Sequence, residues 1–311
     1  MRLALMCARR LATALALCLA ACTALAAPAT ATGYRFGIDT GDKSAGAADK
    51  SAITTRITED LYKRLVPTFA AYRTELAQRR RMVYVAVGPD ALRQAAARRC
   101  DCVVISAFTS SQVWHSVVDR LPPGRARAIT AVYAEPAPQD QLRLAALLYR
   151  RPVRAAAILG PETAFLLPQL LPSLLGQAEI VHAERGDDMT ALLARLRGSE
   201  VLLALPDSTV YNPENIRNIL LSTYRRKQGV IGFSADMVKV GALASTYSEI
   251  EDINAQVAEM AAQYVATGTL PPPQFPRYFR TAVNEGVARS LDLVVTDEAR
   301  RFAQPRPGSS Q

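Results

Sequence analysis

Short apolar runs that end in polar residues recur along the chain, and residues 200–247 show this pattern most clearly. Val201 to Leu205 is continuously apolar, as in a strand buried on both faces. Pro206 to Thr209 ends the run with polar side chains. A helical pattern follows, and Gly229 stops it before a second short run, Val230 to Phe233. The pattern predicts a strand–helix–strand unit of a parallel sheet.

The same alternation of strand and helix lies on both sides of about residue 150. The other expected strands are Tyr34 to Ile38, Met82 to Val87, Cys102 to Ile105, Ala128 to Tyr133, Val153 to Leu159, Glu179 to His182 and Tyr278 to Val283. Two long helices are expected: Ile53 to Arg81, which Pro67 kinks or splits, and Glu251 to Thr267. The sequence therefore predicts an α/β fold with two lobes, built on parallel sheets and joined by a hinge.

The amino terminus has the pattern of an export leader. Three arginines precede an apolar segment, Leu11 to Leu19, that is too short to span a bilayer permanently. Leu19-Ala20-Ala21-Cys22 resembles the lipobox of bacterial lipoproteins, in which Cys22 becomes the lipidated first residue, whereas Ala24-Leu25-Ala26 resembles a signal-peptidase site. We favour a lipoprotein anchored at the periplasmic face of a membrane; a soluble periplasmic protein is the alternative.

Charge and motifs exclude several classes of function. The net charge is +9, but the arginines are scattered, and pairs such as Arg98-Arg99 and Arg225-Arg226 stand at the ends of predicted helices. No basic run is interleaved with aromatic residues, so no nucleic-acid partner is expected. Catalytic serine, zinc and nucleotide motifs are missing, and we interpret both histidines, His115 and His182, as structural or surface residues. We therefore expect neither an enzyme nor a cofactor or metal.

Cys100 and Cys102 flank Asp101 at the start of an apolar run. On an extended strand both sulfurs would point to one face, which suits a soft metal but strains a direct disulfide. Without a third cysteine or a nearby histidine, we interpret the pair as small buried hydrophobic residues.

Five stretches occur in an order that is typical of one protein family. They are Val83 to Gly88, Ala128 to Val132 with Gln141 to Leu144, Pro206 to Val210, Ile231 to Ser245, and Thr281 to Ala288. Together, residues 82–293 resemble the ABC-transporter substrate-binding proteins of the tryptophan/tyrosine-type family. The resemblance implies a periplasmic-binding-protein fold of type I, with two Rossmann-like lobes and a ligand between them.

The resemblance also implies eight ligand-binding residues: Gly88, Pro89, Asp90, Ser106 and Thr109 in the first lobe, and Asp207, Ser208 and Ser234 in the second. The implied ligand is a small amino-acid-like molecule, whose carboxylate would meet helix-end amides and whose ammonium would pair with Asp207. Two alternatives stay open. The segment from Gly88 to Asp90, where Asp90 can cap the helix, is also compatible with a plain strand-to-helix turn, and Asp207 with a capping or turn residue.

The chain departs from the family before Met82, where the family has a full strand–helix–strand unit and this chain has room for little more than one helix. The predicted domains are a signal peptide with lipobox (1–22), a reduced N-terminal α/β lobe (28–150), a C-terminal α/β lobe (151–275), a return strand and helix near the hinge or first lobe (276–298), and a disordered tail (304–311).

Two functions remain open at this stage. The first is a solute-binding protein that delivers its ligand to an ABC permease. The second is an envelope accessory or sensory protein that keeps the fold and partners a receptor, a sensor kinase or an outer-membrane channel. The reduced first lobe favours the second.

Overall fold

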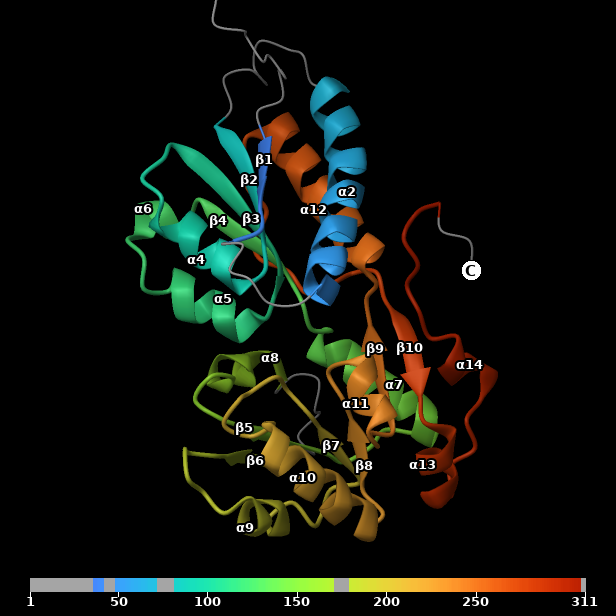
Figure 1. The fold of residues 1–311 in the computed structure, drawn as a ribbon. Coiled ribbons are helices and arrows are strands. Elements are labelled where there is room, and N and C mark those ends of the chain that lie inside the picture. The colour runs from blue at the N-terminus through green and yellow to red at the C-terminus, as the bar shows by residue number, and fades with distance from the viewer. Residues whose placement is uncertain (1–35, 42–47, 72–80, 171–178, 309–311) are drawn as a thin grey trace, which may run out of the picture. The chain divides into compact units, whose positions relative to one another are not determined.

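The computed structural model describes residues 36–41, 48–71, 81–170 and 179–308. They belong to one compact unit, Arg35–Gln311, and form an α/β fold around a four-stranded and a six-stranded sheet (Figure 1). This confirms the predicted fold class. The leader and the predicted lipidation site, Cys22, lie outside the described residues. No helix in the described ranges has both the length and the apolar character needed to cross a membrane.

The first sheet is wholly parallel, and its strands follow one another in chain order. They are β1 (Phe36–Asp39), β2 (Met82–Val87), β3 (Cys102–Thr109) and β4 (Ile129–Tyr133). The last three are almost entirely buried because helices cover both faces of the sheet. The helices α4 (Pro89–Ala97) and α5 (Ser111–Val118) cover one face, and α2 (Ala48–Ala71) and α12 (Ile250–Thr267) cover the other (Figure 1). The short helix α6 (Pro123–Ala126) lies between α5 and β4 in the chain.

The helix α2 is continuous through Pro67, so the proline neither splits it nor ends it. It begins before the predicted start at Ile53, and its described part ends at Ala71. Leu61 and Leu65, from the predicted apolar stripe, are fully buried. Phe69 stacks on Phe36 of β1 at 5.0 Å between ring centroids.

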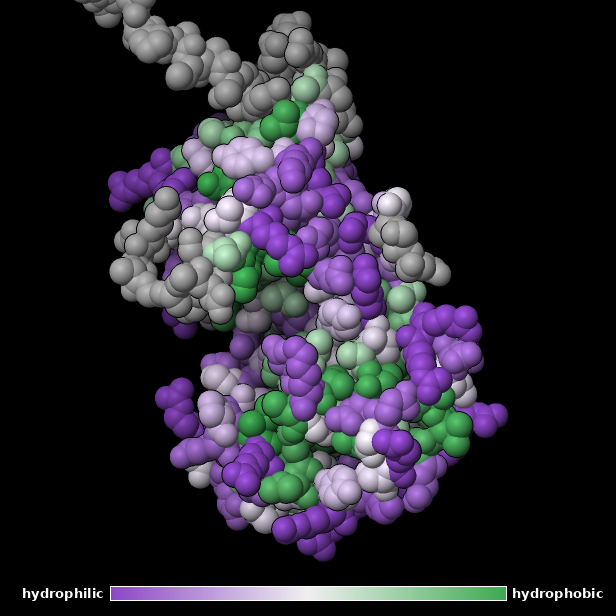
Figure 2. Space-filling view, turned by 45° about the vertical axis from the view of Figure 1, so that its right-hand side comes forward, coloured by the Kyte–Doolittle hydropathy of each residue, from purple (hydrophilic) through white to green (hydrophobic). Residues whose placement is uncertain are grey.

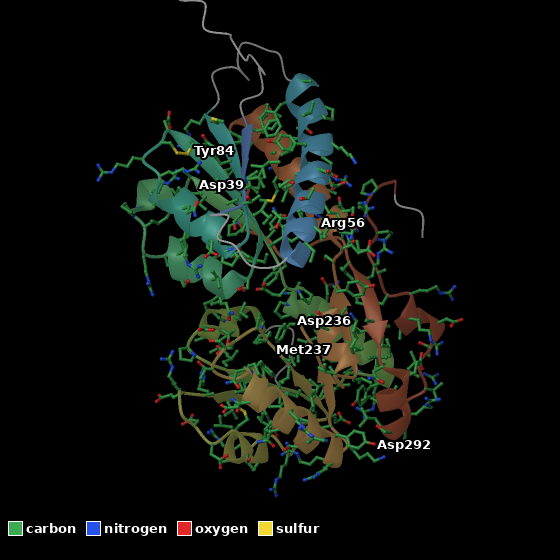
Figure 3. The ribbon with its side chains drawn as sticks, viewed as in Figure 1. Asp39, Arg56, Tyr84, Asp236, Met237 and Asp292 are labelled. Carbon is green, nitrogen blue, oxygen red and sulfur yellow. A yellow bond between two sulfur atoms is a disulfide. The ribbon has the colours of Figure 1, made fainter. Side chains whose placement is uncertain are left out.

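The long helix α12 belongs to the first lobe, although the sequence placed it in the segment 151–275. Asn254 of α12 donates its Nδ2 to the backbone oxygen of Ile57 at 3.1 Å and to Asp60 Oδ2 at 3.0 Å, both on α2. The ion pair between Arg56 and Glu251 joins the same two helices at 2.7 Å (Figure 3). Periodicity identifies a helix, but it does not say which sheet the helix covers.

Within the described ranges the chain passes between the lobes three times. The first passage follows β4, and the second leads from β9 into α12. The third follows Gln274, which still belongs to the first sheet: its backbone bonds to Ala131 and Tyr133 of β4, both at 2.9 Å. Buried Gln141 of α7, the helix after the first passage, is fastened to β9, the strand before the second, since its amide exchanges hydrogen bonds with the backbone of Thr246.

The second sheet is parallel except at one edge. Across the sheet its strands are β10 (Arg280–Val283), β9 (Ala244–Tyr247), β8 (Gly229–Ile231), β7 (Val201–Leu203), β5 (Ala155–Leu159) and β6 (Glu179–His182). The edge strand β10 runs antiparallel to β9, whereas the other strand pairs of this sheet are parallel, as predicted.

Helices cover both faces of the second sheet, because alternate strand residues point into two separate cores. One core contains Ala157, Leu159 and Leu203; the other contains Ala156, Ile158 and Leu202. The helical elements of this lobe are α7 (Pro138–Tyr149), η1 (Ala164–Leu166), α8 (Leu167–Leu170), α9 (Met189–Ala194), α10 (Pro213–Arg225), α11 (Ala235–Lys239), α13 (Glu285–Ser290) and α14 (Asp297–Arg300).

The return segment lies in the second lobe, and not on the first lobe as we considered from the sequence. β10 extends the second sheet, and Ala288 of α13 is buried in the same core as Leu243. The chain beyond it also differs from the predicted disordered tail. Gln304 exchanges two backbone hydrogen bonds with Phe279 at 3.0 Å, and Arg306 forms an ion pair with buried Asp252 at the start of α12.

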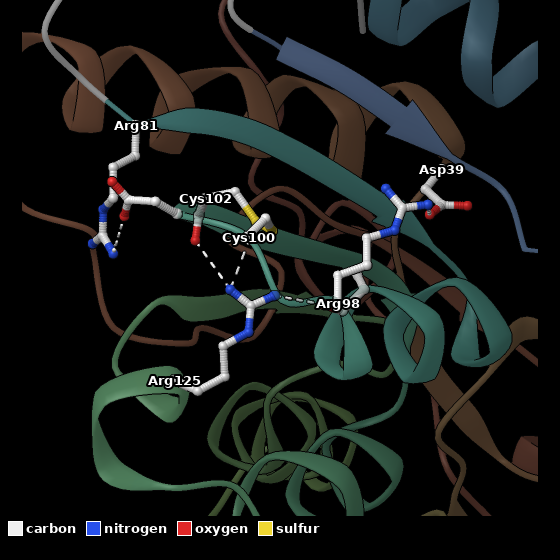
Figure 4. The surroundings of a disulfide bond; sticks show 8 residues. Asp39, Arg81, Arg98, Cys100, Cys102 and Arg125 are labelled. Atoms are coloured by element: carbon white, nitrogen blue, oxygen red, sulfur yellow. Dashed lines mark hydrogen bonds and ion pairs between the residues drawn. A yellow bond between two sulfur atoms is a disulfide. The ribbon is translucent and has the colours of Figure 1, made fainter.

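Cys100 and Cys102 form a disulfide, which corrects their interpretation as free buried thiols (Figure 4). Their Cα atoms are 5.3 Å apart, within the usual range for disulfides. Cys100 and Asp101 form a bend, and β3 begins only at Cys102, so the two cysteines do not share one extended strand.

Candidate functional site

A cavity of about 650 Å³ lies between α5 of the first lobe and the turn after β5 in the second lobe. Its two walls follow the carboxyl ends of parallel strands, because α5 comes after β3, Pro161 to Phe165 after β5, and Ser208 after β7. This is the edge at which α/β sheets bind ligands. The lining residues are Gln112, Val113, His115, Ser116, Asp119 and Arg120 from the first lobe, and Pro161, Glu162, Phe165 and Ser208 from the second.

The first wall is the polar face of α5. Trp114 and Val118, four residues apart, are buried against the first sheet. The opposite face carries polar groups toward the cavity, including Ser116 and Arg120, which are likewise one turn apart. Arg120 is exposed and forms no ion pair with a carboxylate of the described residues. The wall therefore offers a cationic group that is available to an anionic ligand group.

His115 connects the two walls. Its ring lies 4.1 Å from that of Phe165 in the second lobe and 4.9 Å from that of Trp114 beneath it, measured between ring centroids. The imidazole Nδ1 is 3.0 Å from Asp119 Oδ2, one turn further along α5. The contact between His115 and Phe165 makes an aromatic floor on which a flat or apolar ligand group can pack.

The second wall presents an oriented carboxylate. Ser208 donates its backbone N–H to one oxygen of Glu162 at 3.0 Å and its hydroxyl to the other at 2.9 Å. Glu162 and Ser208 come from turns after neighbouring strands, β5 and β7, so the parallel sheet brings them together. Both residues are exposed to the cavity. The Glu162 carboxylate thus has a fixed orientation and can pair with a ligand cation.

Asp207, one residue away, holds these two turns together from below. It is 2% exposed, and its carboxylate accepts hydrogen bonds from the Thr163 hydroxyl and the Thr209 backbone N–H, both at 2.9 Å. Gly160 is required for this approach, because a Cβ there would clash with the Asp207 carboxylate. These contacts fit the alternative interpretation of Asp207 as a turn residue. Asp207 is not among the residues that line the cavity.

Glu135 fixes the start of α5 from the passage between the lobes. One of its carboxylate oxygens accepts hydrogen bonds from the backbone N–H of Ser111, at 2.8 Å, and from the Ser111 hydroxyl. The other oxygen is buried without a hydrogen-bond partner among the described residues. Burial raises the pKa of Glu135 above its ordinary value of 4.5, although the bonds from Ser111 oppose the shift.

We expect Glu135→Gln to change how stability depends on pH. Since the folded-state pKa is raised, the folded protein holds a proton that the unfolded chain releases, and stability falls as pH rises from 4.5 toward the folded-state pKa. Urea unfolding of both proteins from pH 4.5 to neutrality should show that the free energy of unfolding of the variant increases relative to that of the wild type as pH rises. A constant difference would contradict the raised pKa.

Among the eight predicted site residues, Ser208 is a lining residue of this cavity and the others lie elsewhere. Gly88 (φ 87°) and Pro89 begin α4 as a strand-to-helix turn. Asp90 is exposed, pairs with Arg93 at 2.7 Å, and does not cap α4. Ser106 and Thr109 are fully buried within β3.

Ser234 lies in a different groove, between α10 and α11 of the second lobe. Its hydroxyl caps α11 by accepting from the Met237 backbone N–H at 3.3 Å. Leu221 and Val240, which line the same groove, are strongly exposed for apolar residues. Figure 2 shows that apolar surface gathers on this lobe, and Figure 3 places Asp236 and Met237 on α11.

Sequence reasoning missed most of the cavity, although two signals were present. Glu162 stands in a polar turn after an apolar strand, which is the same signal that drew attention to Asp207. The polar face of α5 is visible as Gln112, Ser116 and Arg120 at four-residue spacing opposite Trp114. His115, which the sequence predicts to be a structural or surface residue, lines the cavity beside Phe165, and no local pattern links these two positions because they are fifty residues apart.

Two solved structures share this fold. One is an ABC domain from Streptococcus pneumonia in complex with L-Trp, which is 14% identical with a TM-score of 0.52; the match covers 85% of this chain and 97% of that one. The other is the ligand-free, open form of a substrate-binding protein with adhesive properties from Clostridium difficile, which is 14% identical with a TM-score of 0.56, over 86% and 97% of the two chains. Neither a protein-family model nor a curated protein matches the sequence. The chain therefore shares the fold of these substrate-binding proteins, as its sequence resemblance predicted.

Proposed function

We propose that the chain is the solute-binding protein of an ABC-type uptake system and holds a small amino-acid-like ligand in the cavity between its lobes. The observation that carries the proposal is the cavity itself: its walls come from the strand ends of both lobes, with Arg120 beside Asp119 on the first wall and Glu162 on the second, so it offers both a cationic and an anionic group. A zwitterion matches such a pair of walls. The fold shared with two substrate-binding proteins supports the same function.

Each part of the ligand has a counterpart in the cavity. The carboxylate pairs with the Arg120 guanidinium, and the ammonium pairs with the carboxylate that Ser208 orients on Glu162. The side chain packs on the aromatic floor formed by His115 and Phe165. The ammonium partner in this proposal is Glu162, since both oxygens of Asp207 are already occupied.

Uptake also requires a membrane permease and a place to meet it. In this proposal Cys22 carries the lipid anchor, the two lobes stand in the periplasm, and the loaded protein docks on the permease. The passages after β4, after β9 and after Gln274 are the hinge about which the lobes close on the ligand, and Gln141 ties α7 to β9 on the second-lobe side of this hinge.

A second candidate is an envelope accessory or sensory protein that keeps the fold without transport. Two observations favour it. Among the described residues, only β1 and α2 precede β2, so the first sheet has four strands against six in the second. The second lobe also carries the exposed apolar groove between α10 and α11, which a protein partner could cover.

Thermal-shift screening of the purified chain distinguishes these functions. The panel contains the twenty amino acids, short peptides, simple carboxylates and simple amines. A ligand that binds only the folded state stabilises it by about 2.7 kcal/mol at a hundredfold excess over its Kd. We expect a raised midpoint with zwitterions and smaller shifts with compounds that lack one charge. A shift with none of these compounds would contradict the solute-binding function and favour the accessory protein.

A further inference from the structure

The two sulfurs of the disulfide between Cys100 and Cys102 stand in different surroundings. Cys100 is exposed in the bend before β3, whereas Cys102 is 2% exposed at the first position of the strand. This disulfide lies at the beginning of β3, and the ligand cavity follows the end of the same strand. An external thiol can therefore reach Cys100 but not Cys102, and it does so away from the cavity.

A guanidinium group covers the buried sulfur. Arg125 Nη1 lies 3.1 Å from the backbone oxygen of Cys102 and 3.7 Å from its Sγ, while Nη2 donates to the backbone oxygen of Ala95 at 2.5 Å (Figure 4). The two backbone bonds hold the guanidinium over the disulfide. The contact with Sγ places a positive charge beside the sulfur that would leave if the bond were broken.

The charge of Arg125 has no carboxylate to balance it within the described part of the chain. Among the described residues, its guanidinium contacts two backbone oxygens and the Cys102 sulfur but no carboxylate. Its Nε is buried without a hydrogen bond there. Asp101, which stands between the two cysteines, pairs with Arg81 at 3.6 Å instead. A half-buried cation without a counterion among the described residues stabilises an anion that forms next to it, and a thiolate at Cys102 would be that anion.

From this arrangement we infer that the Cys100–Cys102 disulfide is a reducible site that exchanges with an external dithiol. A thiolate of the dithiol attacks Cys100 Sγ, the Cys100–Cys102 bond breaks, and Cys102 leaves as a thiolate beside Arg125. The second thiol of the dithiol loses its proton and attacks the other sulfur of the dithiol, which is bonded to Cys100 in the mixed disulfide. The bond to Cys100 breaks, and Cys100 leaves as a thiolate. Two electrons pass to the cysteine pair, which takes up protons to become two thiols, and the dithiol becomes a disulfide.

This role is independent of solute binding. The exposed Cys100 determines which sulfur is attacked, and Arg125 lowers the cost of the leaving thiolate, so the rate and the equilibrium both favour reduction.

The first test asks which sulfur exchanges. Cys102→Ser leaves the exposed thiol of Cys100, and Cys100→Ser leaves the buried thiol of Cys102. Both variants are treated with oxidised glutathione, and trypsin releases residues 100–120, which contain no other cysteine, for mass spectrometry. We expect glutathione on Cys100 at a rate at least about tenfold above that on Cys102, because reaction follows access. Equal rates, or a faster Cys102, would overturn the proposal.

The second test asks whether Arg125 stabilises the leaving thiolate. Arg125→Gln is compared with Arg127→Gln, a matched control whose exposed guanidinium contacts only the backbone oxygen of Pro123 among the described residues. Each protein is equilibrated with oxidised and reduced dithiothreitol, alkylated and digested to the same peptide. We expect the equilibrium constant for reduction to fall about tenfold in Arg125→Gln, which equals about 30 mV for a two-electron couple, and to stay unchanged in the control.

Two further results complete this comparison. Circular dichroism checks that Arg125→Gln is folded, and Arg125→Lys, which keeps the charge, should recover part of the lost reduction. Wild-type peptide that remains oxidised at every dithiothreitol ratio, or an Arg125→Gln variant that is reduced as readily as the wild type, would overturn the proposal. Neither result bears on the thermal-shift screen, so failure here is distinct from failure of the proposed solute-binding function.

Discussion

Replacing Asp207 by alanine lowers the stability of the protein by about 3 kcal/mol, the largest loss that we expect from one cavity-proximal substitution. The change removes a buried carboxylate that accepts from the Thr163 hydroxyl and the Thr209 N–H, and it leaves both donors without an acceptor. For a chain of 311 residues the loss corresponds to about 5 °C in Tm. Differential scanning calorimetry without ligand measures it directly.

Asp90→Ala is the matched control for this prediction. Asp90 also follows a strand end, but it is exposed and bonded only to Arg93 among the described residues, so its loss should cost less than about 0.5 kcal/mol. Thr163→Val should reproduce part of the Asp207→Ala effect, since it removes one of the two donors. An Asp207→Ala protein with unchanged Tm but no ligand binding would reverse the assignment and restore the ammonium role.

Glu162→Gln weakens the binding of amine-bearing ligands by about tenfold to a hundredfold and leaves the fold intact. The substitution keeps the size of the side chain and an oxygen that can accept from Ser208, but it removes the negative charge from the second wall of the cavity. This loss of affinity corresponds to about 1.4–2.7 kcal/mol. Isothermal titration with the amino acid that gives the largest thermal shift measures the change.

The control for this prediction is Glu184→Gln, an exposed glutamate of the second lobe that does not line the cavity. Its affinity should equal that of the wild type. A carboxylate ligand without an amine should bind the Glu162→Gln protein as well as the wild type, because its partner is Arg120 on the other wall. If Glu162→Gln binds a zwitterion with unchanged affinity, Glu162 is not the ammonium partner.

The positions of the site residues illustrate what sequence patterns omit. Ser106 and Thr109 were expected after the end of a strand at Ile105, but they lie within β3, the strand that leads to the cavity. They are buried because β3 continues through Thr109 before the helix starts at Ser111. A shift of a few residues in the end of a strand is enough to exchange buried residues for cavity residues, and local propensity does not define strand ends that closely.

The sequence by itself determined the alternation of strands and helices, the two α/β lobes and the polar turns after the strands. Those features depend on local periodicity and on turn residues such as Pro206 and Gly229, which act within a few positions. Only the tertiary structure decided that α12 covers the first sheet, that β10 closes the second, that Asp207 holds two turns together, and that Glu162 and Arg120 face one cavity. Each of these depends on contacts between segments far apart in the chain, and their energies come from packing and hydrogen bonds that no local pattern encodes.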